Sequence, residues 1–430
     1  MVNVSNEMKL AVVGGGSTYT PELVAGLARE RERLDLRDLV LQDIDPERRE
    51  VVGGLAERML RAAGHDGKLS VTDDLDAAVE GASFVLIQLR VGGQDARLSD
   101  ETIPLACGCI GQETTGAGGL GKALRTVPVV LQIADRVREL AEQDAWIVDF
   151  TNPVGIVVRG LLDHGHRAVG LCNVAIGFQR AIAQLLGIEP HRVLIDQVGL
   201  NHLTWVRAVR VDGDDVLPEL LAERAEDFAL DFPAALLQRL GAIPSYYLRY
   251  FYLHDNILER QRVEKPRAAE VAEIERELLE LYRDPNLTTK PKLLERRGGA
   301  YYSDAATQLV ASLATGDGDV QVVDIRNGGT LAGLADDDVV EVPARIGADG
   351  PEPLAQPPLA PELLGLVQHV AAYERLAVQA ATTGDRELVF KALLAHPLIG
   401  QTPQAEELAE KLLAEGREHL PQFEANEVTA

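Results

Sequence analysis

A cysteine and a histidine are the first residues whose types suggest a metal site. Cys172 directly follows the apolar segment Ala168-Val-Gly-Leu171, and His202 lies further along the chain, within Gly199-Leu-Asn-His-Leu203. A thiolate and a neutral imidazole could bind one divalent cation and leave coordination positions open for substrate oxygens. A lone cysteine at a strand end, however, is usually a small buried side chain, and a lone histidine is usually structural. The two residues by themselves therefore favour a structural role over a metal site.

Tyrosines form a second unusual group. Tyr246, Tyr247, Tyr250 and Tyr252 lie close together in a chain with only 4% aromatic residues. One interpretation is an aromatic helical face whose hydroxyls are hydrogen-bonded at the edge of a core. The other is a catalytic base, because a phenol whose pKa of about 10 is lowered by a nearby cation can accept a substrate proton. The periodicity of the segment does not separate the two.

Several arginines stand beside glycine, proline or acidic residues rather than on plain amphipathic faces. They are Arg90 before Val-Gly-Gly, Arg97 before Asp100-Glu101, Arg267 after Pro266, and Arg297 before two glycines. Planar guanidinium groups bind phosphate esters through paired hydrogen bonds. Most surface arginines are only solvated charges, so these residues indicate an anion site only if they converge.

A glycine-rich loop lies between the apolar strand pattern Lys9 to Val13 and the helical pattern that begins at Pro21. Glycines let the backbone approach a pyrophosphate, and the N-terminus of the next helix offers unpaired N–H groups. Asp43, at the end of the next strand pattern, could bind a ribose diol and disfavour a 2′-phosphate. A plain glycine turn is the alternative, since Tyr19 replaces the third glycine of the usual fingerprint. We predict NAD binding, through Gly14, Gly15, Gly16, Ser17, Thr18 and Asp43.

The elements around these residues predict an α/β protein. Short apolar strands alternate with helical patterns in the first half, which is typical of a doubly wound, Rossmann-type parallel sheet. Beyond about residue 190 two strand-rich stretches lie among helical segments, which predicts a second lobe of α+β type. We expect an NAD-binding domain over residues 1–180 and a catalytic and oligomerisation domain over residues 181–430.

Composition limits the partners. The chain has 430 residues, with 42 Lys and Arg against 67 Asp and Glu, a net charge of −25 that argues against nucleic acid or anionic membrane as partner. Three cysteines are too few for a disulfide framework, and neither a signal-peptide pattern nor a membrane-spanning apolar run is apparent. We therefore expect a reduced, cytoplasmic protein.

Taken in order along the chain, these motifs resemble the NAD- and metal-dependent glycosidases of glycoside hydrolase family 4, most closely the 6-phospho-β-glucosidases. The resemblance covers essentially the whole chain, and it implies a lactate/malate dehydrogenase-like fold whose α+β lobe holds substrate and metal. It rests on the segments Gly14–Thr18, Arg90–Gly93, Arg97 with Asp100 and Glu101, Gly111–Thr114, Thr151–Pro153, Cys172–Val174, Gly199–His202, Tyr247–Tyr250 and Arg297–Ser303.

The resemblance implies roles for the residues of the first two groups. Cys172 and His202 match the pair that binds Mn²⁺, for which Co²⁺, Ni²⁺ or Fe²⁺ could substitute. Tyr247 matches the catalytic base, whose pKa is expected to fall beside the cation. Glu113 is a candidate for proton handling.

It also implies which residues bind the sugar. Arg97, Asn152 and Arg267 match positions that hold the phosphorylated sugar. Asn173 matches members that cleave β-linkages, because members acting on α-linked phosphoglucosides tend to have aspartate there. Ala175 departs from the family pattern, which has proline at this position.

The implied reaction is hydrolysis of a phosphorylated β-linked disaccharide, such as cellobiose 6-phosphate, or of an aryl 6-phospho-β-glucoside. It proceeds by NAD-mediated oxidation at C3, metal-assisted deprotonation at C2, elimination, water addition and re-reduction, with retention of configuration. A homodimer or homotetramer is expected. The alternatives are a 6-phospho-α-glucosidase, a glycosidase for an unphosphorylated sugar, a plain NAD-dependent 2-hydroxy-acid dehydrogenase, and a catalytically silent NAD- and sugar-phosphate-binding sensor.

Overall fold

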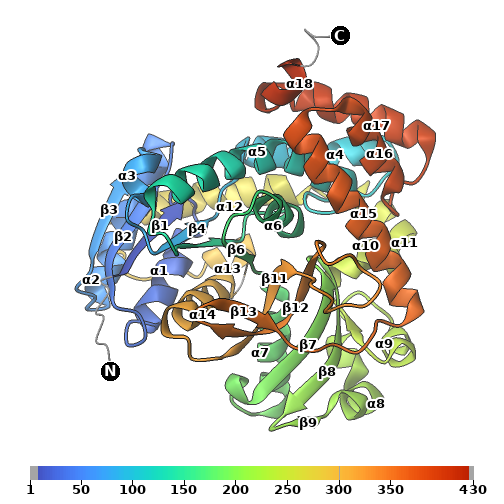
Figure 1. Ribbon diagram of the computed structural model, residues 1–430, viewed down its shortest axis with the longest axis horizontal. Coiled ribbons are helices and arrows are strands. Elements are labelled where there is room, and N and C mark those ends of the chain that lie inside the picture. Colours follow the sequence, from blue (N-terminus) through green and yellow to red (C-terminus); the bar gives the residue numbers. More distant parts are fainter. Residues whose placement is uncertain (1–7, 300, 426–430) are drawn as a thin grey trace.

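The computed structural model describes residues 8–299 and 301–425 (Figure 1). Six parallel strands form one half of its sheet, in the order β3-β2-β1-β4-β5-β6. This order is typical of dinucleotide-binding domains. The strands are β1 (Met8–Val13), β2 (Leu36–Gln42), β3 (Lys68–Thr72), β4 (Phe84–Ile87), β5 (Trp146–Asp149) and β6 (Ala168–Gly170).

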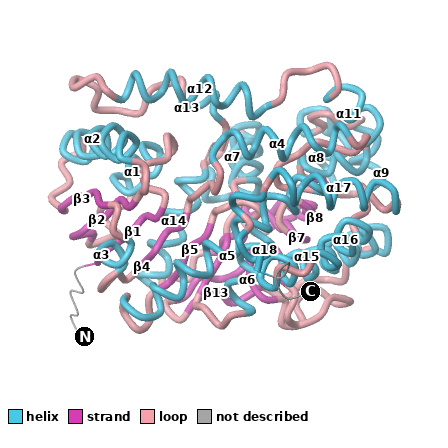
Figure 2. Tube along the Cα trace, turned by 90° about the horizontal axis from the view of Figure 1, so that it is seen from above, coloured by secondary structure: helices cyan, strands magenta, loops and turns pink. Residues whose placement is uncertain are grey.

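Helices cover this parallel section on both faces, as the view from above shows (Figure 2). Because the central strands are covered on both sides, they are largely apolar, and Leu10, Ala11 and Val12 of β1 are completely buried. The edge strand β3 is more polar and leaves Lys68 exposed. The helices are α1 (Thr20–Arg29), α2 (Pro46–Ala62), α3 (Leu75–Val79), α4 (Gly93–Ala106), α5 (Gly116–Leu140) and α6 (Val154–Asp163).

The second half of the chain extends the same sheet with antiparallel strands, in the order β6-β11-β12-β7-β8-β10. Two single-residue bridges form the joint: Gly170 of β6 pairs with Asp324 of β11, and Gly199 of β7 pairs with Glu341 of β12. The predicted mixed α/β fold is confirmed, and one sheet runs through both halves. The strands are β7 (Val193–Leu200), β8 (Leu203–Val211), β9 (Asp214–Asp215), β10 (Ile243–Pro244), β11 (Val320–Arg326), β12 (Val339–Gly347) and β13 (Gly350–Pro353).

The remaining helices surround the antiparallel section and then return to the parallel one. Helix α15 packs on α5 and α6, and α17 packs on α4 and α5, so the end of the chain covers the beginning (Figure 1). Within the described residues no helix is long and apolar enough to cross a membrane. The helices are α7 (Val174–Leu186), α8 (Leu217–Phe228), α9 (Ala234–Leu240), α10 (Arg249–Tyr252), α11 (His254–Gln261), α12 (Arg267–Tyr282), α13 (Leu294–Arg297), α14 (Tyr302–Thr315), α15 (Pro361–Thr383), α16 (Arg386–Ala395), α17 (Thr402–Glu415) and α18 (Pro421–Ala425).

Candidate active site

The glycine loop turns sharply between β1 and α1. Gly14 has φ +83°, and a Cβ there would lie 2.7 Å from the carbonyl oxygen of Gln88, so only glycine fits. The N–H groups of Gly14 and Gly15 both donate to the carbonyl of Gln42, at 2.9 and 2.7 Å. At the end of β2, Asp43 accepts the N–H of Gly16 at 2.9 Å, which fixes its carboxylate against the loop. The sequence-predicted loop and its acidic partner are thus brought together.

Ser17 and Thr18 face in different directions. Ser17 lines the large cavity described below. Thr18 is completely buried, because its hydroxyl donates to Glu275 of α12 at 3.2 Å and its carbonyl accepts the Tyr282 hydroxyl at 2.7 Å. The Thr18 side chain, which we expected to contribute to cofactor binding, instead ties the loop to α12.

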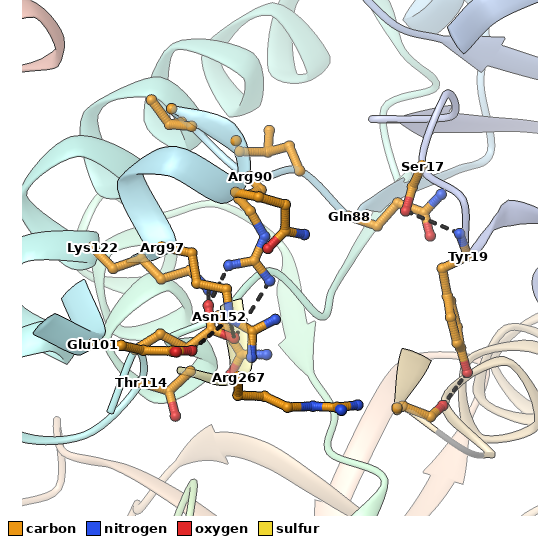
Figure 3. A pocket seen from close by; sticks show the side chains of 18 of the residues that line it. Ser17, Tyr19, Gln88, Arg90, Arg97, Glu101, Thr114, Lys122, Asn152 and Arg267 are labelled. Atoms are coloured by element: carbon orange, nitrogen blue, oxygen red, sulfur yellow. Dashed lines mark hydrogen bonds and ion pairs between the residues drawn. The ribbon is translucent and has the colours of Figure 1, made fainter. Parts of the chain in front are cut away.

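One cavity of about 1090 Å³ runs between the glycine loop and the second half of the chain. Its volume is at the upper end of the range for small-ligand sites, so it has room for a dinucleotide and a sugar together. In Figure 3, Arg90, Arg97, Asn152 and Arg267 gather on one side of it, and Ser17, Gln88 and Tyr19 lie on the other. The predicted site residues that line it are Gly14, Ser17, Asp43, Arg97, Asn152, Asn173, Tyr247 and Arg267. Those that do not line it are Gly15, Gly16, Thr18, Cys172 and His202.

A cation cluster forms around Glu113 on the side of the cavity opposite the glycine loop (Figure 3). Its carboxylate accepts hydrogen bonds from Arg90 and from Lys122 Nζ at 2.6 Å, and it forms an ion pair with Arg97, whose Nε lies 3.1 Å away. Arg97 is shared with Glu101, at 2.9 Å. Two arginines and a lysine thus face two carboxylates, and the planar guanidinium groups of the arginines suit a phosphate ester.

The same contacts set the pKa values of the cluster. Burial disfavours ionisation of Glu113, but Arg90, Lys122 and Arg97 outweigh it and hold the pKa of this carboxyl well below its usual range. Burial and the neighbouring Arg90 charge lower the pKa of Lys122 to about 7. Glu113 therefore carries no proton at neutral pH and does not serve as an acid in the protein alone.

Arg267 and Asn152 complete this side of the cavity. Arg267, at the start of α12, donates to Glu270 at 2.8 Å and to the carbonyl of Arg296 at 2.7 Å, and it is exposed. The Oδ1 atom of Asn152 is buried without a hydrogen-bond partner in the described part of the chain. An acceptor left unpaired at a cavity wall suits a ligand hydroxyl.

Cys172 and His202 lie next to the cavity but behind its wall. Cys172 follows β6 and is buried, which raises the pKa of its thiol well above the usual value, and the carboxylate of Glu341 adds to the rise. His202 occupies the turn between β7 and β8 with φ +63°. Burial and the charge of Lys122 lower the pKa of its imidazole to about 3, so the ring is neutral.

These two side chains fit a metal ion. The Nε2 atom of His202 is buried and has no hydrogen-bond partner among the described residues, as expected of a nitrogen reserved for another ligand. The Cys172 thiol needs a neighbouring cation in order to ionise, because nothing around it is positive enough. In the described part of the chain no three His, Cys, Asp or Glu side chains form a metal cluster, so further donors would have to come from substrate or water.

Tyr247 connects this pair to the cavity. Its ring stacks on the His202 ring with centroids 3.5 Å apart and planes 13° from parallel. Burial raises the pKa of the Tyr247 hydroxyl well above its usual value, and Tyr246, Tyr302 and Cys172 raise it further. The fall in pKa expected from the sequence is therefore absent in the protein alone, because aromatic rings and a thiol surround the phenol. A cation at Cys172 and His202 would act in the opposite direction and lower the pKa of the Tyr247 hydroxyl.

Asn173 and Ala175 begin helix α7. Asn173 is at the N-cap position and lines the cavity. Ala175 is buried in the first turn, where the helix forms with alanine as well as it would with proline. The departure from the family pattern leaves the local backbone helical.

Several residues of the site were not identified from the sequence. Lys122 of α5 and Glu275 of α12 are both buried in ion pairs, Glu275 with Arg297 at 3.0 Å and with Arg48 at 3.1 Å. A signal for Lys122 was present in the glycine run Gly116–Gly121. A Cβ on Gly118 would lie 2.3 Å from the Asp100 carbonyl, so glycine lets α5 approach α4 and bring Lys122 to Glu113.

Acidic side chains are buried near Cys172 and His202, at the joint of the sheet. Asn201 donates to Glu341 at 2.9 Å and to Asp324 at 3.2 Å. Glu374 of α15 lies nearby, in a small cavity that Asn201 and His202 also line. Burial raises the pKa of Glu341 to about 7 and that of Glu374 to about 8.

Glu374→Gln is expected to become more stable relative to the parent as pH rises from about 5 to about 8. The pKa of Glu374 is about 8 in the folded protein, above the ordinary value of 4.5 that applies when the chain is unfolded. The parent therefore has the full stability contribution of neutral Glu374 below pH 4.5 and loses it as the pH rises through about 8. The difference between variant and parent changes by at most about 1.4 kcal/mol per pH unit. Thermal midpoints across this range measure it. Glu362→Gln, an exposed change on the same helix, serves as the control, and parallel curves for Glu374→Gln and the parent would contradict the expectation.

The fold and site together define an α/β enzyme with a dinucleotide-type glycine loop, an anion-binding cluster and a cysteine–histidine pair around one cavity. Residues 9–188 match the family model described as family 4 glycosyl hydrolase, and residues 197–399 match its C-terminal domain. The chain belongs to glycosyl hydrolase family 4, as the ordered motifs predicted.

Individual relatives are similar over nearly the whole chain. A probable 6-phospho-β-glucosidase of Bacillus subtilis is 40% identical, covering 97% of this chain and 98% of the relative. The 6-phospho-β-glucosidase of Thermotoga maritima, solved with NAD and glucose 6-phosphate, has a TM-score of 0.90 at 36% identity, covering 96% of this chain and 99% of that one. Another structure of that enzyme contains manganese, NAD⁺ and glucose 6-phosphate. A malate dehydrogenase of Plasmodium falciparum shares the fold alone, with a TM-score of 0.53 at 15% identity, covering 90% and 99% of the two chains.

Proposed function

We propose that this protein is a 6-phospho-β-glucosidase that uses NAD and a divalent metal. The observation that carries the proposal is the placement of a glycine loop, a cation cluster and the Tyr247–His202 stack around one cavity. The similarity to family 4 enzymes over nearly the full chain supports it. A dehydrogenase of the malate type would account for the glycine loop but not for the cation cluster or the stacked tyrosine.

The cation cluster positions the substrate. Arg97 and Arg267 would bind the 6-phosphate, and the unpaired Oδ1 atom of Asn152 would accept a hydrogen bond from a sugar hydroxyl. Glu113 keeps Arg90, Arg97 and Lys122 oriented, because its carboxylate contacts all three. These contacts favour a phosphorylated sugar over an unphosphorylated one.

The glycine loop and Asp43 would hold the cofactor. Bound NAD⁺ would take a hydride from C3 of the sugar and return it at the end of the cycle. The Asp43 carboxylate, fixed by the Gly16 N–H, is placed to accept from a ribose diol.

Cys172 and His202 would hold the divalent metal, Mn²⁺ by similarity to the Thermotoga enzyme's complex. When bound, it would serve as a Lewis acid that eases loss of the C2 proton from the oxidised sugar. Tyr247 lines the cavity beside His202, and its hydroxyl would accept that proton. Asn173, an amide, cannot act as an acid toward the leaving group, which fits a β-linked substrate better than an α-linked one.

Asp43→Asn is expected to lower the preference for NAD⁺ over NADP⁺ by about tenfold or more, a change of about 1.4 kcal/mol. The substitution removes the charge that repels a 2′-phosphate while keeping the shape of the side chain. Dissociation constants of both cofactors measure the effect. Asp38→Asn, on the same strand but at its other end, is the control, and an unchanged ratio for Asp43→Asn would remove Asp43 from the ribose site.

The function is tested with p-nitrophenyl β-glucoside 6-phosphate, NAD⁺, Mn²⁺ and a thiol reductant, leaving out each component in turn. We expect nitrophenol release that needs NAD⁺ and metal without accumulation of NADH. Equal activity on the unphosphorylated glucoside would remove the phosphate roles of Arg97 and Arg267. Activity only on the α-linked phosphate would show that Asn173 does not mark the linkage. No activity on any of them would favour the dehydrogenase or the silent sensor.

We also propose a cytoplasmic location and a homodimer or homotetramer. Three free, buried cysteines are compatible with a reducing compartment. Sedimentation or light scattering of the purified protein tests the oligomeric state.

A further inference from the structure

The Thr114 hydroxyl lies between two groups that constrain its single proton. It is 2.9 Å from the Nδ1 atom of His202 and 2.8 Å from the Oε1 atom of Gln112. The same Oε1 atom accepts the backbone N–H of Thr114 at 2.5 Å. Because a backbone N–H can only donate, the Gln112 atom at this position is the amide oxygen and not the nitrogen.

This arrangement decides the direction of both hydrogen bonds. An amide oxygen accepts only, so the Thr114 hydroxyl proton must point to Gln112. If it pointed to His202, two oxygen lone pairs would face each other at 2.8 Å and one hydrogen bond would be lost. The Thr114 oxygen therefore accepts, and Nδ1 of His202 must donate to it.

A neutral imidazole carries one N–H, so a proton on Nδ1 leaves Nε2 with its lone pair exposed. Nε2 is the atom that is buried without a partner among the described residues. The stack on Tyr247, with centroids 3.5 Å apart, fixes the plane of the ring. A half-turn of the ring within that plane would place a carbon atom opposite the Thr114 oxygen and lose the hydrogen bond at 2.9 Å.

We propose that Thr114 and Gln112 are positioning residues that fix His202 in the tautomer with Nδ1 protonated, so that Nε2 is preset as a metal ligand. The inference rests on the proposed role of His202 in holding the metal. The proton sits on Nδ1 before any cation binds, and no rearrangement of the ring is needed. Outer partners of metal-binding histidines fix tautomer and ring orientation in this way, and their loss typically weakens metal binding by about 10- to 100-fold.

The segment around Thr114 also joins two parts of the site. Glu113, the residue before Thr114, contacts Arg90, Arg97 and Lys122, while the Thr114 side chain contacts His202. Two adjacent residues thus fix the position of the cation cluster relative to the histidine. A change in this turn affects both, so the test must separate tautomer control from displacement of the turn.

Three variants make this separation. Thr114→Val keeps the shape of the side chain and removes the hydroxyl, and Thr114→Ser restores a hydroxyl at the same position. Thr115→Val is the matched control, because Thr115 is buried next to Thr114 and its side chain does not cap helix α5. NAD⁺ affinity and thermal midpoint, measured for each variant, report whether the fold is intact.

The first measurement is Mn²⁺ affinity of the metal-free, NAD⁺-loaded enzyme, from the electron paramagnetic resonance signal of free Mn²⁺. We expect about 10- to 100-fold weaker binding for Thr114→Val. Thr114→Ser and Thr115→Val should stay close to the parent. Unchanged affinity in Thr114→Val, or equal loss in Thr114→Ser, would overturn the proposal. Absence of specific Mn²⁺ binding in the parent would instead refute the metal role in the proposed function.

The second measurement reads the tautomer without metal or activity. Long-range ¹H–¹⁵N correlation spectra of metal-free protein with ¹⁵N-labelled histidine separate the two neutral tautomers, and the His202 signals are assigned by their absence in His202→Gln. The parent should show Nδ1 protonated, and Thr114→Val should lose that single tautomer. Protonation on Nε2 in the parent would overturn the proposal even if Mn²⁺ binds.

Discussion

Replacing Tyr247 by phenylalanine is expected to lower kcat by about 10²- to 10⁴-fold, the usual contribution of a general base. The change removes only the hydroxyl and keeps the ring that stacks on His202. Cofactor and metal affinities should therefore stay near the parent values. Steady-state kinetics with the aryl 6-phospho-β-glucoside measure the loss.

A second readout assigns the loss to the proton step. The parent should exchange the C2 proton of glucose 6-phosphate with solvent deuterium in the presence of NAD⁺ and Mn²⁺, and Tyr247→Phe should not. Tyr252→Phe is the control, because the Tyr252 hydroxyl contacts Trp205 at 3.1 Å and does not line the cavity. If Tyr247→Phe retained more than about a tenth of kcat, another group would have to be the base.

Cys172→Ala is expected to abolish metal-dependent activity and to weaken Mn²⁺ binding by more than about 100-fold. Loss of a group that only supports a ligand already costs about 10- to 100-fold, and Cys172 would be one of only two protein ligands. For the same reason, chelation should inactivate the parent, and added Mn²⁺ should restore it.

The control for this prediction is Cys109→Ala, which removes another buried thiol far along the chain from the ligand pair. It should leave both activity and Mn²⁺ affinity unchanged. A thiolate that binds metal is also an oxidisable one, so air oxidation should inactivate the parent and Cys109→Ala alike. Metal-dependent activity that survived alkylation of Cys172 would remove it from the ligand set.

Local chemistry made the glycine loop and its acidic neighbour predictable. The loop at Gly14 follows from one strand, one turn and one helix, and Asp43 follows from the end of the next strand. The direction of the Thr18 side chain was not predictable from the local pattern. Its hydroxyl points away from the cavity to Glu275, a partner in a helix far along the chain.

The other side of the site depends on long-range contacts. A metal-binding role for Cys172 and His202 was inferred only from the family resemblance, because their residue types and spacing favoured ordinary structural roles. The pairing of Lys122 with Glu113 depends on the close approach of α5 to α4. The glycine run allows this approach, but the sequence alone does not predict it. The raised pKa of Tyr247 likewise depends on burial among Tyr246, Tyr302 and Cys172, which no periodicity shows.

The fold was predictable to a similar extent. Alternating apolar strands and helices indicated the parallel sheet, since each strand–helix unit is local. That the second half would continue the same sheet was not apparent. The joint consists of Gly170 opposite Asp324 and Gly199 opposite Glu341, and single-residue bridges between distant segments leave no sequence period.

The position of this joint implies that the proposed metal ion would also affect the stability of the sheet. Cys172 follows β6, the last parallel strand, and His202 follows β7 in the antiparallel section, so the proposed ligands come from opposite sides of the joint. A cation bound by both residues would form a reversible cross-link between the parallel and antiparallel sections of the sheet. Binding would then be linked to the integrity of the whole sheet, and the thermal midpoint would follow the free Mn²⁺ concentration. An enzyme that lost its metal would lose rigidity together with reactivity.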